Sequence, residues 1–227
     1  MKKIHLLLAA CAMLVVMGSC GNSQNQSQNQ NEVNDEGLIF VSSDLAFFEL
    51  HGHVKSCNYA VDPTGQHFDC VEYDRSGKII SVDGYNPFEL EEPWSELNEE
   101  TSTMEDHCQW NRDDHGQIAT YYCDWSGATF TWTKGLPSSV IRSHEDMMYK
   151  YELEYNSNGN LVKQTVYGGT DEELEDNTMA LDHILEYTYL EFDDQGNWIR
   201  RIEKWTDAEL DFLNGEEEFT RSIEYYK

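Results

Sequence analysis

Alternating apolar and polar residues predict β-strands through much of the chain. Leu153 and Tyr155 share one face of an extended segment, as do Leu190 and Phe192, and this period of two is typical of strands with one buried face. A short motif separates such segments: an aromatic or apolar residue, Asp or Asn, two variable residues, Gly and a polar residue. Its copies carry the acid or amide at Asp62, Asp74, Asp113, Asn156 and Asp193. The pattern predicts a series of β-hairpins.

Asp or Asn at the first turn position and Gly at the fourth are the signature of a type I turn. In a hairpin that Gly adopts a left-handed conformation and forms a bulge. This register places the residue before the Asp opposite the residue two after the Gly. Each apolar or aromatic pair of this kind contributes about 0.2–1 kcal/mol beyond burial. The predicted pairs are Tyr73 with Ile79, Tyr155 with Leu161, and Phe192 with Trp198. Two further pairs fit less well: Val61 with His67, and Arg112 with Ile118.

The spacing of the first two turns makes residues 66–73 a strand that two hairpins share, which is a meander. The opposite face of the predicted sheet is not cleanly polar, because apolar side chains also lie there: Phe68, Ile80, Val82, Val162 and Ile199. Such a sheet needs cover on part of its second side, so we expect it to be curled or partly covered.

Insertions between the hairpins predict a few other elements. Residues 43–50 and 171–185 have apolar side chains at helical spacing, and Thr206 followed by Glu209 matches a capping box that opens a helix to about residue 213. Residues 89–105 are rich in Glu and contain Pro93, which predicts a loop. The predicted fold class is therefore mainly all-β, an antiparallel meander of hairpins in a curled sheet with one or two short helices.

The segments LEYNSNGNLVKQTVY and LEFDDQGNWIRRIEKW, with their Tyr-Asn or Phe-Asp turns and Gly-Asn pairs, resemble the YD (Rhs-type) repeats of bacterial secreted and cell-surface proteins. The resemblance covers about half of the chain, in divergent copies with uneven spacing. It implies that the hairpins are a scaffold that builds β-structure and carries no catalytic residue.

The N-terminus has the pattern of an export signal. Lys2 and Lys3 precede an apolar run that ends in MGSC at Cys20, and small residues before a cysteine resemble a lipobox. The run is shorter than the roughly 20 apolar residues of a transmembrane helix. LAAC at Cys11 is a second lipobox match, but cleavage there would leave an apolar region of only about seven residues. We expect a signal peptide at 1–19 and lipidation of Cys20.

The domain organisation follows from the composition after the signal. Residues 20–37 begin with a Gly, Asn, Ser and Gln tract, which predicts a flexible polar tether. Residues 38–227 are expected to form a single β-rich domain. The protein is then a lipid-anchored component of the cell envelope, at the outer membrane of a Gram-negative bacterium. The tether has no acid before Glu32, which leaves the periplasmic and surface faces both open.

The chain is strongly acidic, with 43 Asp and Glu against 15 Lys and Arg and a formal net charge of −28. This charge argues against nucleic acid as a partner, because phosphates would be repelled. It also argues against a domain that lies flat on an anionic membrane.

The expected mature chain keeps four cysteines, Cys57, Cys70, Cys108 and Cys123, and an even number in an exported domain suggests disulfides. Cys57 and Cys70 are equidistant from one turn, but the bulged register puts them on opposite faces, where they cannot bond. Cys108 and Cys123 meet the same obstacle. The connectivity therefore stays open among three possibilities.

The candidate chemistry is sparse. His51 and His53 are a possible metal pair without a visible third ligand. Calcium is the more plausible cofactor, in the acidic segments 171–176 and 216–218, although neither matches an EF-hand and we expect no cofactor. Paired acids such as Asp113-Asp114 stand at turn positions, where Asp has a local role. We expect no catalytic residues.

Aromatic residues suggest a possible ligand surface. Tyr121, Trp125 and Trp132 are the best candidates for exposed rings that would contact a sugar, although rings on strands are more often core. The leading functional hypothesis is a non-catalytic envelope lipoprotein that binds a protein partner or serves as a structural module. A carbohydrate-binding lipoprotein is the alternative, and a secreted hydrolase is third.

Overall fold

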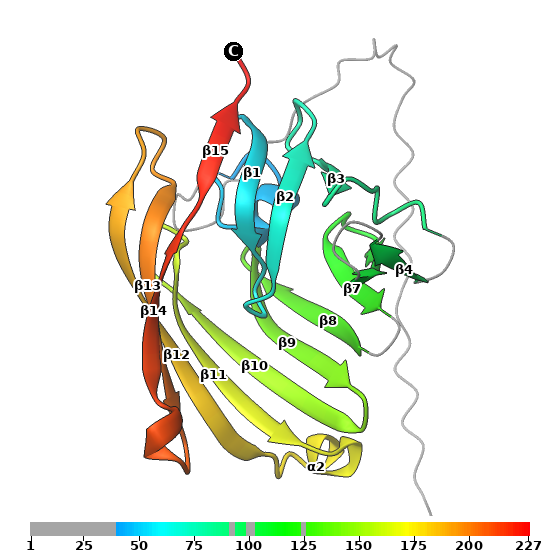
Figure 1. Ribbon diagram of the computed structural model, residues 1–227, viewed down its shortest axis with the longest axis vertical. Coiled ribbons are helices and arrows are strands. Elements are labelled where there is room, and N and C mark those ends of the chain that lie inside the picture. Colours follow the sequence, from blue (N-terminus) through cyan, green and yellow to red (C-terminus); the bar gives the residue numbers. More distant parts are fainter. Residues whose placement is uncertain (1–39, 91–93, 99–102, 124–125) are drawn as a thin grey trace, which may run out of the picture. The chain divides into compact units, whose positions relative to one another are not determined.

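The computed structural model describes residues 40–90, 94–98, 103–123 and 126–227, which lie within one compact unit, Asn31–Lys227. The expected signal peptide, the Cys20 lipidation site and the tether lie outside the described residues. Strands dominate the described chain, and they form antiparallel sheets built of hairpins (Figure 1). The expected fold class is confirmed.

The larger sheet has nine strands, which are hydrogen-bonded in sequence order from β6 to β14. They are β6 (Gln109–Arg112), β7 (Ile118–Cys123), β8 (Ser126–Thr133), β9 (Leu136–His144), β10 (Met147–Tyr155), β11 (Leu161–Gly169), β12 (Ala180–Phe192), β13 (Trp198–Asp207) and β14 (Gly215–Thr220). Every neighbouring pair in this sheet is antiparallel. The sheet is therefore one continuous meander.

The remaining strands form two smaller sheets. The four-stranded sheet has the order β15-β1-β2-β3, from β1 (Val54–Val61), β2 (His67–Tyr73), β3 (Ile79–Val82) and β15 (Ser222–Tyr225). A separate hairpin pairs β4 (Trp94–Asn98) with β5 (Thr103–His107). The helices are α1 (Ser43–Phe47), α2 (Asp171–Glu175) and a single 3-10 turn, η1 (Asp211–Leu213). Because β15 pairs with β1, the C-terminal strand forms one edge of the four-stranded sheet.

All five predicted turns form with the predicted cross-strand pairs. The turn glycines have φ between 76° and 82° or, at Gly196, 85°, a conformation that glycine adopts without steric cost. The acid or amide of each motif accepts hydrogen bonds from backbone N–H groups two and four residues later. At Asp193 these come from Gln195 and Asn197, both at 2.9 Å. The spacing that recurs in all five copies of the motif thus has a local structural cause.

A second irregularity follows four of the turns, and the sequence did not reveal it. The register shifts by one residue immediately after the predicted pair. The residues left without a direct partner are Ile80, Ala119, Val162 and Ile199. Three of these are apolar residues that we expected on the second face of the sheet, so their placement follows from the bulges.

One face of the nine-stranded sheet, the inner face, packs against α1 and the β1–β2 hairpin (Figure 1). At the hairpin, Thr64 Oγ1 lies 3.4 Å from the Tyr121 hydroxyl of β7. The ring of His67 stacks on Phe219 of β14 at 4.8 Å. Strands near both ends of the sheet thus reach one hairpin, so the sheet is curled around it.

Aromatic side chains fill the interface between α1 and the inner face. Phe47 packs edge-on against Phe130 at 4.9 Å between ring centroids, and Phe48 stacks on Trp110 at 6.4 Å. Trp110 also contacts Phe68 of β2 at 5.8 Å. All five side chains are buried. Burial of such rings, at about 25 cal/mol per Å² of apolar area, makes this cluster the main hydrophobic core.

A buried ion network joins the segment after α1 to the opposite end of the nine-stranded sheet. Arg201 lies between Glu49 at 3.3 Å and Glu203 at 2.5 Å. Arg221 donates hydrogen bonds to the backbone oxygens of Phe48 and Glu49. These charged groups are almost wholly buried and each has a partner, so they fix the segment after α1 to the nine-stranded sheet.

Three expected elements differ from the structure. The helix predicted over 171–185 stops at Glu175, and β12 follows, because pairing with β11 and β13 overrides helical spacing. The capping box is at Thr170 and Glu173 instead. Thr206 lies in β13, and only η1 follows it. The loop predicted over 89–105 contains β4 and most of β5, whereas the helix predicted over 43–50 forms as the shorter α1.

Candidate functional site

The inner face continues beyond the β1–β2 hairpin. Val140 and Tyr151 are a cross-strand pair on β9 and β10, and both are buried. Four residues further along the same strands, His144 and Met147 also pair, and both are exposed. Residues four apart on a strand share a face. The hairpin therefore covers only part of the inner face.

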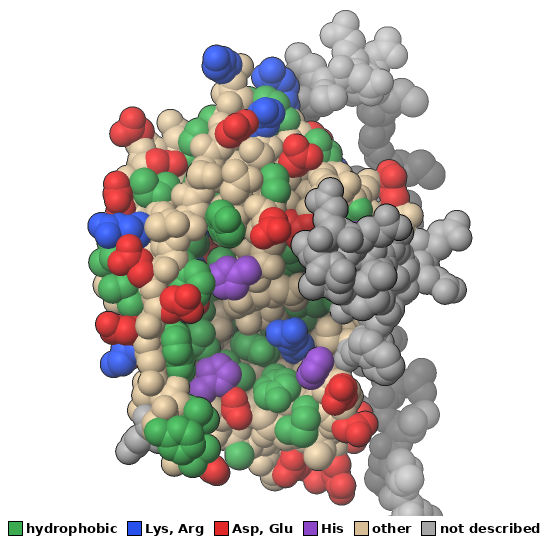
Figure 2. Space-filling view, in the orientation of Figure 1, with side chains coloured by type: hydrophobic (Ala, Val, Ile, Leu, Met, Phe, Trp, Pro, Cys, Tyr) green, Lys and Arg blue, Asp and Glu red, His purple; other side chains and the backbone are tan. Residues whose placement is uncertain are grey.

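The exposed and half-buried side chains on this uncovered part form a set that we call the open inner face. It consists of Arg142, His144, Met147, Tyr149, His183, Leu185 and Trp205. The register places them on strands β9, β10, β12 and β13. Figure 2 shows hydrophobic side chains, histidines and a basic side chain together over these strands, with acidic side chains beside and around them.

Two aromatic rings of the open inner face lie over glycines of neighbouring strands. Tyr149 pairs with Gly168, and a Cβ atom at Gly168 would lie 3.6 Å from Tyr149 Cε1. Trp205 pairs with Gly215, where a Cβ atom would overlap the indole ring. The indole N–H also donates a 2.6 Å hydrogen bond to the Leu213 carbonyl oxygen. These glycines leave room for both rings, and the hydrogen bond fixes the orientation of Trp205.

Arg142 supplies a positive charge at the same place. Its strand partner is Tyr149. The ion pairs formed among the described residues do not include it. Burial disfavours the charged form of Arg142, but the charges of Tyr121, Tyr151 and Asp62 outweigh this effect and raise its pKa.

Polar groups with unused hydrogen-bonding capacity lie behind this surface. The Oδ2 atom of Asp62 and the Oε1 atom of Gln164 are buried and have no hydrogen-bond partner, and the same holds for Nε of Arg142. Gln164 donates from its amide nitrogen to the Pro63 carbonyl oxygen at 3.0 Å. Buried polar atoms are normally paired. This junction of hairpin and sheet thus holds acceptors and a donor that the protein itself leaves unsatisfied.

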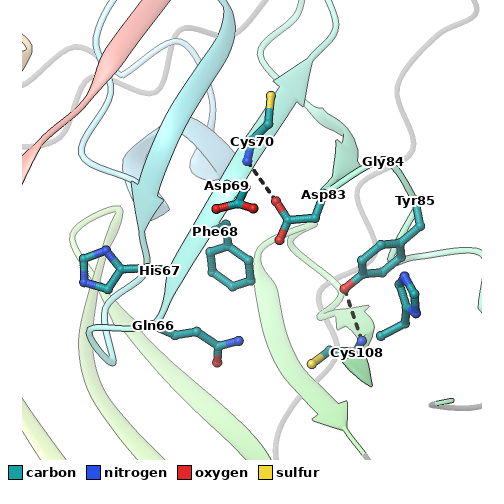
Figure 3. A pocket seen from close by; sticks show the side chains of 10 residues that line it. Gln66, His67, Phe68, Asp69, Cys70, Asp83, Gly84, Tyr85 and Cys108 are labelled. Carbon is teal, nitrogen blue, oxygen red and sulfur yellow. Dashed lines mark hydrogen bonds between the residues drawn. The ribbon is translucent and has the colours of Figure 1, made fainter. Parts of the chain in front are cut away.

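A separate cavity of about 500 Å³ lies beside β2 and the segment after β3 (Figure 3). Asp69 and Asp83 bring two carboxylates to it, and Tyr85 closes one side. Asp83 accepts a 2.8 Å hydrogen bond from the Cys70 N–H, and Tyr85 accepts one of 3.1 Å from the Cys108 N–H. Both polar side chains therefore hold the backbone of the cavity wall.

The thiol that lines the cavity, Cys70, is a poor nucleophile. Burial, together with the charges of Glu72 and Asp83, raises the pKa of the Cys70 thiol, which keeps it protonated. Its sulfur also points away from the two carboxylates (Figure 3). Burial raises the pKa of Asp83, although the hydrogen bond from the Cys70 N–H opposes this effect. The groups in this cavity fit a structural role better than a catalytic one.

The four candidate cysteines divide into one disulfide and two thiols. Cys108 and Cys123 are bonded, with Cα atoms 4.4 Å apart, so the expectation that they lie on opposite faces is wrong. The register shift between Asn111 and Arg112 places the two cysteines opposite each other, next to the pair Gln109–Tyr122. Cys57 and Cys70 are free. Their hairpin has no such shift, so they lie on opposite faces as expected.

The aromatic candidates from the sequence are not the exposed rings of the structure. Tyr121 is 1% exposed and lies in the core, which contradicts its expected role. Trp132 is half-buried, packs against Phe47 and donates a hydrogen bond to the Ile118 carbonyl oxygen at 2.8 Å. Trp125 lies outside the described residues. The rings of the open inner face, Tyr149 and Trp205, were missed, because alternation alone does not tell which face the hairpin covers.

The metal candidates are also dispersed. The His51 ring stacks on Phe40 at 4.7 Å, and His53 is exposed. Of the two acidic segments considered for calcium, one forms α2 and the other lies in β14. Within the described ranges, no group of three His, Cys, Asp or Glu side chains is placed to hold a metal ion.

No protein-family model matches the chain, and no curated protein matches it. None of the helices in the described part of the chain is long and apolar enough to cross a membrane. The open inner face, with its two aromatic rings and the guanidinium of Arg142, is the candidate site on its own geometry.

Proposed function

We propose that this protein is a non-catalytic lipoprotein of the cell envelope, anchored through Cys20, which binds a ligand on its open inner face. The observation that carries the proposal is a half-covered sheet face with Tyr149, Trp205 and Arg142 in an otherwise acidic molecule. A patch of this composition is typical of a binding surface, since aromatic residues and Arg are enriched at interfaces. We further propose that the hairpins are divergent YD-type repeats, which the shared turn register supports.

Anchoring is tested by substitution of the two candidate lipobox cysteines. In a bacterial host given an alkyne-labelled fatty acid, we expect Cys20→Ser to abolish label incorporation into the protein. Cys11→Ser is the matched control and keeps the label, because the signal peptide is expected to be cleaved before Cys20. Loss of label in Cys11→Ser with retention in Cys20→Ser would move the anchor to Cys11.

Ligand binding at the inner face is tested by photocrosslinking in cells. A photoreactive amino acid at His144 or Met147 is expected to yield crosslinked adducts. The matched controls are Glu186 and Lys204, which pair with each other on the opposite face of β12 and β13. We expect few adducts from these two. Equal crosslinking from both faces, or none from either, would refute a binding site on the inner face.

A further inference from the structure

We propose that the ligand of the open inner face is a carbohydrate, bound by ring stacking on Tyr149 and Trp205 and by hydrogen bonds from Arg142. The proposal rests on the proposed function, because it names the ligand class of that same surface. Three features of the described residues support a glycan rather than a protein segment or an acyl chain.

The first feature is the presentation of the two rings. Tyr149 and Trp205 are half-buried, and each lies over a glycine of the adjacent strand. Their strands, β10 and β13, are three positions apart in the sheet. At roughly 4.8 Å per strand the lateral span is about 14 Å, and the register sets Trp205 level with Leu153, so the two rings are also offset by four residues, about 13 Å, along the strands. Two separated, fixed aromatic surfaces suit the apolar faces of two sugar rings in one chain.

The second feature is the balance of hydrogen-bonding groups. Sugar hydroxyls donate and accept, so they require both kinds of partner. Arg142 supplies donors in a planar fork, and it pairs with Tyr149 on the neighbouring strand. His183 lies on the same face, and its Nδ1 atom is 2.6 Å from Asp182 Oδ2, so its other ring nitrogen can face a ligand.

The third feature is charge. A basic protein partner would be attracted to the acidic side chains around the open inner face but repelled by Arg142 within it. An acyl chain would remove water from the guanidinium of Arg142 and offer it no hydrogen-bond acceptor, which is costly. A glycan meets neither obstacle, because its hydroxyls can hydrogen-bond to the guanidinium in place of water.

The test uses the full-length, lipidated protein in detergent micelles on an array of bacterial, plant and animal glycans. Calorimetric titration follows with the oligosaccharide that is retained most strongly. We expect Tyr149→Ala and Trp205→Ala each to weaken binding about tenfold, the loss typical of a central aromatic contact. Tyr149→Phe keeps the ring and is expected to keep the affinity. Tyr59→Ala removes an exposed ring elsewhere and is the control.

Loss of binding in an alanine variant could also come from misfolding, so a second variant leaves the core contacts intact. Met147 is 43% exposed on the same face, so Met147→Arg adds bulk there without removal of a core contact. We expect weaker glycan binding with an unchanged melting temperature. Retention of no glycan on the array overturns the proposal, and so does an affinity that Trp205→Ala and Met147→Arg leave unchanged. Protein adducts from His144 with no glycan binding would overturn the carbohydrate proposal alone, whereas an absence of adducts would overturn the binding function as well.

Discussion

The first residue of each hairpin turn makes the same local hydrogen bonds in very different surroundings. Asp62 is buried beneath the nine-stranded sheet, whereas Asp74 lies at the surface. Burial raises the pKa of Asp62 despite hydrogen bonds from Thr64 and Gln66. Burial also opposes ionisation of Asp74, but there the hydrogen bonds from Ser76 and Lys78 outweigh it, and the pKa is lowered. The same motif position thus has a raised pKa in one turn and a lowered pKa in another.

These shifts predict opposite pH responses for two matched substitutions. The raised pKa of Asp62 means that its contribution to stability is present below about pH 3.9, the unfolded value, and is lost as pH rises through the folded pKa. We therefore expect Asp62→Asn to gain stability relative to wild type as pH rises to 7, by at most about 1.4 kcal/mol per pH unit. Asn156 shows that an amide supports the turn.

Asp74→Asn is the matched control with the reverse sign. Because its folded pKa is lowered, Asp74 stabilises the fold above about pH 3.9 and loses this effect as pH falls through the folded pKa. We expect the variant to be less stable than wild type at pH 7 and equal to it near pH 2. Urea unfolding between pH 2 and pH 7 measures the free energy of unfolding of both variants and of wild type. Parallel pH curves for the two variants would contradict the assignment.

At the scale of the element, the hairpin is the unit that the sequence predicts best. The turn motif depends on local hydrogen bonds and on a left-handed glycine, so residues such as Tyr155 and Leu161 could be paired without knowledge of the fold. The bulge one residue later recurs after four of the five turns, but the turn residues alone did not predict it. The disulfide Cys108–Cys123 was misjudged for that reason.

Two turn glycines separate local strain from tertiary packing. Gly77 and Gly116 have φ of 82° and 78°, so an alanine at either is strained by about 1–2 kcal/mol. A Cβ atom at Gly116 would meet nothing within 4 Å, whereas at Gly77 it would lie 2.8 Å from Leu45 Cδ1 and Ser42 Oγ. We expect Gly77→Ala to cost about 1–3 kcal/mol more than Gly116→Ala. Chemical denaturation measures the difference, and equal losses would show that α1 does not pack on this turn.

At the scale of the whole molecule, the contacts between sheets decide which face remains free. The curl of the nine-stranded sheet and its cover by α1 were foreseen only in part, since the apolar residues of the expected second face did not identify what covers it, and one of them, Ile80, is 49% exposed. The candidate site was not foreseen. Arg142 and Tyr149 belong to one hairpin, but Trp205 comes from a strand much later in the sequence, and only the tertiary arrangement shows that all three share an uncovered surface.

The ion network between the segment after α1 and the nine-stranded sheet is expected to be essential for this arrangement. Glu49→Ala leaves Arg201 with Glu203 alone and removes the carboxylate that accepts from Tyr189 at 2.9 Å. We expect a loss of about 3–5 kcal/mol in the free energy of unfolding, as for other broken buried pairs. The exposed pair Arg200–Glu218 is the control, and Glu218→Ala is expected to cost at most about 1 kcal/mol. Similar losses in the two variants would contradict a structural role for the network.

The most direct test of the account is hydroxyl-radical footprinting of the protein in native envelopes and after purification, with oxidation measured by mass spectrometry. Met147 and Trp205 report on the open inner face, and the exposed rings of Tyr59 and Tyr122 report on other surfaces. We predict that Met147 and Trp205 are oxidised in the purified protein and protected in envelopes, while the other two change little. Equal oxidation of Met147 and Trp205 in both preparations would contradict a ligand on the inner face.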